Sequence, residues 1–122
     1  MNTLSVIIAE HDPSAARALM SFLDHHVGAV RLANSRTELE SALPHEPVDL
    51  LIADLETVAL DDVARITRDF HLPVICVHRI PDEDMWAAAL EAGALDMCLR
   101  TDAGAILLAI RNHLADNRTS AA

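Results

Sequence analysis

Three ionisable residues follow the first apolar run of the sequence and are candidates for binding a cation. Glu10, His11 and Asp12 come directly after the run Leu4 to Ala9 and just before Pro13. Carboxylates at the end of a buried strand are typical ligands of Mg²⁺, which prefers oxygen donors. The histidine between them is unexpected, because imidazole suits zinc, copper or nickel better. Asp12 before Pro13 also has a structural interpretation, since this is a common start of a helix.

Further ionisable residues end later apolar runs in the same way. Asp54 ends the run "DLLIAD", His78 ends "LPVICVH", and Arg100 follows "DMCL". Each alone is an ordinary residue of a strand end, and a lone histidine there is more often hydrogen-bonded than catalytic. A site requires the fold to bring these strand ends together.

Short apolar runs alternate with amphipathic segments along the chain. This alternation predicts an α/β fold with a parallel sheet covered on both faces and right-handed crossovers. We expect a three-layer, flavodoxin-like (βα)5 architecture with strand order 2-1-3-4-5, which places the carboxyl ends of the strands at one rim. Gly93 is expected to end the fourth helix, and Trp86 within that helix to pack against its own domain. The expected strands are 4–9, 30–33, 49–54, 72–78 and 96–99, and the expected helices are 13–26, 35–43, 61–70, 81–92 and 102–115.

The composition is that of a globular domain with an acidic surface. The chain has 122 residues, 52% of them hydrophobic, and a formal net charge of −10. We expect one domain over residues 1–116 and a flexible tail over 117–122. The negative charge argues against direct nucleic-acid binding, and no apolar run is long enough for a membrane span. Cys76 and Cys98 lie in apolar runs, which predicts buried free thiols and a cytoplasmic location.

The sequence resembles the receiver domain of bacterial two-component response regulators. The segments that carry the resemblance are "VIIAEHDP", "PVDLLIADLE", "LPVICV" and "ALEAGALDMCLR", and it extends from Leu4 to about Leu114. In that family the acid that ends the third strand accepts a phosphoryl group beside bound magnesium. The resemblance implies that Asp54 is the phosphoacceptor and that Glu10 binds the metal. It also implies that Glu56 binds the metal through its backbone carbonyl.

Several positions depart from the family pattern. His11 stands at the second acidic position, which predicts weak Mg²⁺ binding because imidazole is a poor ligand for this ion. His78 stands in place of a Ser or Thr, and Arg100 in place of the lysine. Because the chain has no lysine and carries an arginine at this position, we expect an ion pair between Arg100 and Asp54. Further departures are Arg79 after His78, Met97 in place of an aromatic switch residue and Thr101 in place of a proline.

Three functions are compatible with this sequence. The first is a phosphorelay receiver that accepts a phosphoryl group at Asp54, with Arg100 and His78 beside it. The second is a pseudo-receiver, an interaction module that works without phosphorylation. The third is a sensor in which Glu10, His11, Asp54 and His78 bind a transition ion. An enzyme proper is not expected, because no pairing of a nucleophile with a base is identifiable.

The resemblance also implies partners. A receiver takes its phosphoryl group from a histidine kinase or a phosphotransfer protein. It acts on a downstream protein, or on a second copy of itself, through the fourth helix, fifth strand and fifth helix. In this chain that face includes Trp86, Met97 and the helix 102–115.

Overall fold

A computed structural model describes residues 3–115 and shows a five-stranded parallel sheet between two layers of helices. The strand order is β2-β1-β3-β4-β5, which confirms the predicted topology. The predicted tail, 117–122, lies outside the described residues. The strands are β1 (Ser5–Ala9), β2 (Ala29–Ala33), β3 (Leu50–Asp54), β4 (Val74–His78) and β5 (Asp96–Leu99). The helices are α1 (Pro13–Leu23), α2 (Arg36–Ala42), α3 (Leu60–Phe70), α4 (Glu83–Glu91) and α5 (Ala103–Ile110), and α5 continues into a π-helical turn, Arg111–Ala115.

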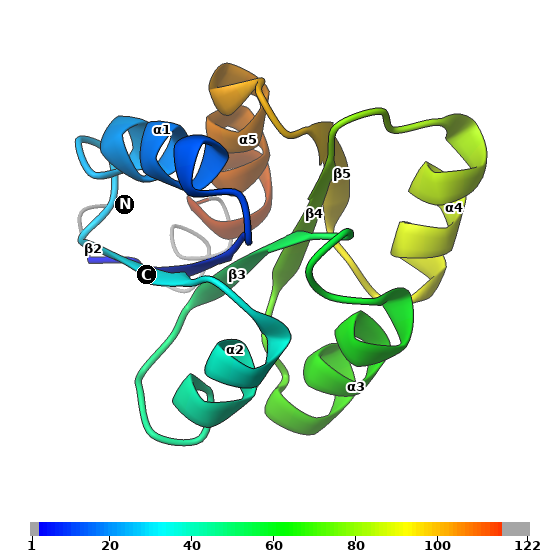
Figure 1. The fold of residues 1–122 in the computed structure, drawn as a ribbon, viewed down its shortest axis with the longest axis horizontal. Coiled ribbons are helices and arrows are strands. Elements are labelled where there is room, and N and C mark those ends of the chain that lie inside the picture. Colours follow the sequence, from blue (N-terminus) through cyan, green and yellow to red (C-terminus); the bar gives the residue numbers. More distant parts are fainter. Residues whose placement is uncertain (1–2, 116–122) are drawn as a thin grey trace.

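The helices cover both faces of the sheet, so the three central strands are buried on both sides. Helices α1 and α5 lie on one face, and α2, α3 and α4 lie on the other (Figure 1). All five residues of β3 are buried, and the side chains of Leu51 and Ile52 enter opposite cores. Alternate residues of a strand point to opposite faces, which explains why a doubly covered strand is a continuous apolar run.

Side-chain caps fix where most helices begin. The carboxylate of Asp12 accepts the backbone N–H groups of Ser14 and Ala15 at the start of α1, as predicted. Asp82 and Asp102 cap α4 and α5 in the same way, and Ser35 caps α2. Each cap satisfies a donor that the helix leaves free.

The structure corrects several sequence predictions. Helix α4 begins at Glu83 rather than at Pro81, and α1 ends at Leu23 rather than at about His26. Trp86 is covered only in part by its own domain: 48% of it is exposed, and Ala89 is the buried residue of α4. Phe70, the last residue of α3, is 38% exposed.

Among the described residues, no helix is both long enough and apolar enough to cross a membrane. Cys76 and Cys98 are buried free thiols, as predicted. Burial raises the pKa of Cys76 to about 12 and that of Cys98 to about 11. Both sulfurs are therefore protonated and unreactive at neutral pH.

Gly93, which follows α4, generates a test of the fold. Its φ angle is +104°, and a Cβ atom there would lie 2.8 Å from Oγ1 of Thr67. Gly93→Ala should therefore lower the free energy of unfolding by about 1–3 kcal/mol, measured by denaturant titration. Gly104→Ala is the matched control, because Gly104 lies in α5 and its Cβ would meet only Asp102 Oδ1, at 3.6 Å. Equal losses in both variants would contradict this account of the turn.

Candidate functional site at the carboxyl ends of the strands

The register of the sheet brings two carboxylates side by side. Ala9 of β1 pairs with Ala53 of β3, so Glu10 and Asp54 are the next residues on neighbouring strands. Both are buried, with 3% of Glu10 and 0% of Asp54 exposed. Two acids in such a place repel each other and lose hydration, which is costly unless other groups compensate.

His11 completes this cluster. Its Nδ1 atom lies 3.5 Å from Oδ2 of Asp54 and 3.6 Å from Oε2 of Glu10. Glu10, His11 and Asp54 each offer one ligand atom, and these atoms all lie within 4.8 Å of one another. About half of the His11 side chain is exposed, so the cluster is closed on the sheet side and open to solvent on the histidine side. The fold thus brings together three of the residues that the sequence suggested as ligands of a cation.

Thr57 joins the histidine to the aspartate, and the sequence analysis assigned it no role. Its hydroxyl donates to Oδ2 of Asp54 at 3.0 Å and lies 2.7 Å from Nδ1 of His11. It also accepts the backbone N–H of His11 at 3.1 Å. Thr57 is three residues after Asp54 in a turn closed by Thr57 N–H donating to Asp54 O, and that spacing is the signal that could have identified it.

One oxygen of Asp54 has no partner. Oδ2 takes the Thr57 hydrogen bond, whereas the buried Oδ1 accepts none. Buried acceptors are nearly always hydrogen-bonded, so an oxygen left free in this way indicates a place for an incoming group.

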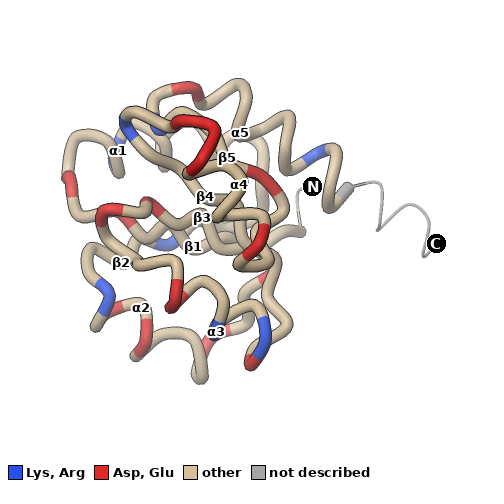
Figure 2. The backbone as a smooth tube through the Cα atoms, turned by 90° about the vertical axis from the view of Figure 1, so that its right-hand side faces the viewer, with Lys and Arg blue, Asp and Glu red and all other residues tan. Residues whose placement is uncertain are grey.

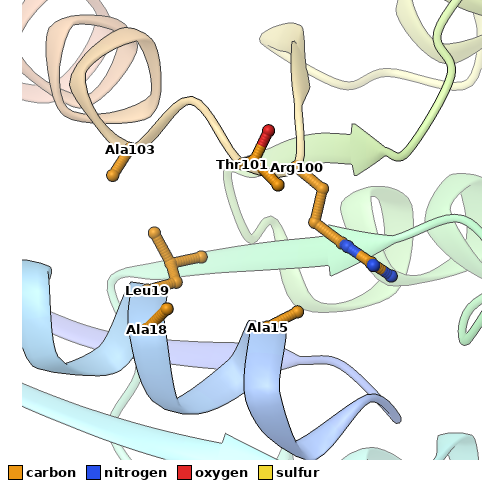
Figure 3. A pocket seen from close by; sticks show the side chains of 6 residues that line it. All are labelled: Ala15, Ala18, Leu19, Arg100, Thr101 and Ala103. Atoms are coloured by element: carbon orange, nitrogen blue, oxygen red, sulfur yellow. The ribbon is translucent and has the colours of Figure 1, made fainter.

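Arg100 does not pair with Asp54, which corrects the sequence prediction. Its guanidinium lies 3.6 Å from Oε1 of Glu10 and 3.4 Å from Oδ2 of Asp12. Among the described residues, no ion pair or hydrogen bond joins it to Asp54. The side chain starts beside Thr101 and extends past Ala15 to the beginning of α1, where those two acids lie (Figure 3). Asp12 keeps its capping role and uses its second oxygen for this pair.

Below the guanidinium, a small hollow separates α1 from the loop that joins β5 to α5. Small or aliphatic side chains line most of it, and Arg100 lies at one end (Figure 3). The lining residues are Ala15, Ala18, Leu19, Arg100, Thr101 and Ala103.

Two predicted site residues lie outside the cluster. The carboxylate of Glu56 forms a two-pronged pair with Arg79, with Nε donating to Oε1 at 2.6 Å and a second nitrogen donating to Oε2 at 3.0 Å. This pair joins the loop after β3 to the loop after β4, and it lowers the pKa of Glu56. The ring of His78 accepts the backbone N–H of Ile80 at Nδ1. His78 is therefore absent from the metal set that the sequence suggested.

The electrostatics of Glu10 reflect its position between opposing charges. Burial is the largest effect and raises the pKa of Glu10 above its usual 4.5, and neighbouring Asp54 raises it further. The N–H of Asp12, which donates to Oε2 at 3.1 Å, and the charge of Arg100 lower it, without cancelling the rise. Acidic residues are spread over much of the chain, whereas arginines are fewer (Figure 2). The resulting net negative charge attracts cations to the protein.

Known structures share this fold. The RcsB response regulator of Salmonella typhimurium superposes with a TM-score of 0.84 at 23% identity, covering 96% of this chain and 62% of that one. This chain therefore spans less than two thirds of the RcsB chain. A response regulator from Thermotoga maritima gives a TM-score of 0.80 at 23% identity, covering 90% of this chain and 96% of that one.

A third neighbour is a single receiver domain. The signal receiver domain of an HD domain-containing protein from Pseudomonas fluorescens gives a TM-score of 0.83 at 20% identity, covering 96% of this chain and 98% of that one. The chain has the response-regulator receiver fold. No protein-family model matches the sequence, and no curated protein sequence matches it either.

The raised pKa of Glu10 predicts how stability changes with pH. The native state holds this proton more tightly than the unfolded chain, so ionisation of Glu10 removes stability as pH rises through and above about 4.5. Glu10→Gln cannot ionise. Its free energy of unfolding should therefore increase relative to the natural protein between about pH 4 and about pH 7, as measured by urea titration at each pH.

Glu56→Gln is the matched control with the opposite sign. The pKa of Glu56 is lowered by Arg79, so its ionised form contributes stability above the unfolded pKa and loses it as pH falls. This variant should become less stable relative to the natural protein as pH rises. Stability curves of the three proteins that run parallel over this range would show that the two acids are not perturbed as described.

Proposed function

We propose that the protein is a signal receiver domain in which Asp54 accepts a phosphoryl group from a histidine kinase or a phosphotransfer protein. The observation that carries this proposal is the free oxygen of Asp54 at the carboxyl end of the central strand, inside a cluster of ionisable side chains. Ligands of open parallel sheets bind at this edge. The likeness to the receiver fold supports the same assignment.

The transfer is a substitution at phosphorus. An oxygen of Asp54 attacks the phosphorus atom of a phosphohistidine, and the bond between that phosphorus and the donor nitrogen breaks. The electron pair stays on the leaving imidazole, which takes a proton in becoming neutral. An acyl phosphate on Asp54 results. The protein is then a phosphoryl acceptor and not an enzyme with a separate substrate.

Nearby donors stabilise the added negative charge in this proposal. Thr57 holds the other oxygen of Asp54 by its hydroxyl, which fixes the carboxylate. The Nε atom of Arg100 is buried and has no partner, so it is a free donor at this edge. Positioned charges of this kind supply much of the catalysis in phosphoryl transfer.

The Mg²⁺ that the receiver fold implies does not fit the donors well. One of the three clustered ligand atoms is an imidazole nitrogen rather than an oxygen, and Mg²⁺ requires a nearly octahedral set of oxygens. We therefore expect weak Mg²⁺ binding and derive no step from this ion.

The output surface is proposed to be the face of α4, β5 and α5. Trp86 on α4, Leu99 on β5 and Leu108 on α5 are exposed apolar residues, with exposed fractions of 48%, 42% and 57%. Patches of this kind mark protein contacts, so a downstream protein or a second copy would bind here. The free buried thiols suit a reducing compartment, and we place the protein in the cytoplasm.

One observation favours a second candidate, the pseudo-receiver. Asp54 is 0% exposed, and the pair of Arg79 and Glu56 joins the two loops beside it without any phosphoryl group. A domain fixed in this way would present its partner surface permanently.

Phosphorylation of Asp54 separates the two candidates. Treatment with acetyl phosphate should add one phosphoryl group, mapped to Asp54 by mass spectrometry, and Mg²⁺ should change the yield little. Asp54→Asn should lose the label. The exposed Asp61→Asn should retain it, because Asp61 lies in the first turn of α3 and away from the cluster. A chain that stays unmodified with and without Mg²⁺ would exclude the receiver function and support the pseudo-receiver.

A further inference from the structure

The cluster of Glu10, His11 and Asp54 has the composition of a transition-metal site. It offers two carboxylate oxygens and one imidazole nitrogen from side chains on two adjacent strand ends. Within residues 3–115 it is the one group of three or more acids, histidines or cysteines close enough to share an ion. The buried thiols contribute nothing, since burial raises the pKa of both.

The two separations that involve His11 are closer to those expected around a tetrahedral ion than around an octahedral one. Ligands bound at about 2.0–2.1 Å lie about 3.3 Å apart in a tetrahedron but only about 2.9 Å apart at neighbouring corners of an octahedron. Nδ1 of His11 lies 3.5 Å from the Asp54 oxygen and 3.6 Å from the Glu10 oxygen. These separations are closer to the tetrahedral value. Zn²⁺ and Co²⁺ commonly adopt tetrahedral coordination.

An independent observation points to a missing partner in this place. Oδ1 of Asp54 is buried and accepts no hydrogen bond. Glu10 is also buried, and Arg100 contacts its Oε1 atom at 3.6 Å rather than the Oε2 atom that faces His11. A divalent ion bound to Asp54, through the free Oδ1 or through the neighbouring Oδ2, would neutralise the two carboxylates.

The exposure of His11 makes an ion at this site accessible from solvent. The side chain is about half exposed, so a water or a partner's side chain can reach an ion held at Nδ1. In the structure this nitrogen contacts the hydroxyl of Thr57. To bind a metal, Nδ1 must offer its lone pair, so the ring proton of His11 must be on Nε2.

We propose that Glu10, His11 and Asp54 bind a divalent transition ion of the class of Zn²⁺ and Co²⁺ in preference to Mg²⁺. The site uses His11 through Nδ1 and the two carboxylates through one oxygen each, with the remaining position open. The exchange of a carboxylate for an imidazole at position 11 is what selects these ions. This inference concerns the same rim as the proposed phosphoacceptor but does not require phosphorylation.

Metal titration of the whole chain tests the proposal without a phosphoryl donor. Calorimetry with Co²⁺ and Zn²⁺ should give one ion per chain and tighter binding than Mg²⁺, and bound Co²⁺ should show the intense visible absorption of a tetrahedral centre. His11→Ala should weaken Co²⁺ and Zn²⁺ binding by at least about tenfold. His11→Asp should strengthen Mg²⁺ binding and weaken Zn²⁺ binding, because it restores an oxygen donor.

The control is His45→Ala, which removes an exposed histidine from the loop between α2 and β3 and should leave both titrations unchanged. Unchanged Co²⁺ binding in His11→Ala would overturn the proposal, as would Mg²⁺ binding as tight as Zn²⁺ in the natural chain. Because no phosphoryl donor is present, such a result leaves the labelling of Asp54 as a separate question.

Discussion

The burial of two carboxylates at adjacent strand ends is the constraint on which the rest of the rim depends. The pairing of Ala9 with Ala53 forces Glu10 and Asp54 together, out of water and next to each other. Burial and mutual repulsion disfavour their ionised forms. The N–H of Asp12, the hydroxyl of Thr57 and the guanidinium of Arg100 each offset part of this cost. One oxygen of Asp54 remains without a partner.

The two arginines at the rim pair with acids other than Asp54, so neither of them neutralises the charge of Asp54 directly. Arg100 reaches past Asp54 to Glu10 and Asp12, and Arg79 binds Glu56 through two parallel hydrogen bonds. The fork of an arginine favours such paired contacts over a point contact with one oxygen. In the described part of the chain, Asp54 therefore has no paired arginine, and a group that binds it would approach from the solvent side, where His11 lies.

Apolar runs predicted the strands well, because a strand covered on both faces must be apolar along its length, as "LLIAD" in β3 is. Strand order then predicted the rim, and the convergence of Glu10, His11 and Asp54 follows from it. Side-chain pairing was not predictable in the same way. Arg100 has a long, flexible side chain, and several acids lie within its reach. Which acid it pairs with depends on distances in the folded structure, which the spacing of residues in the sequence does not give. The exposure of Trp86 was not predicted, because a short alanine-rich helix has a weak hydrophobic periodicity and the sequence does not show which of its faces is buried.

The central claim is that a histidine among these buried acids changes which ion the rim accepts. Crystals grown with Co²⁺ and measured at the cobalt absorption edge would locate the ion directly. The account predicts an anomalous peak about 2.0–2.2 Å from Nδ1 of His11 and from one oxygen each of Glu10 and Asp54. A peak bound by the two carboxylates without His11, or no peak at this rim, would contradict it.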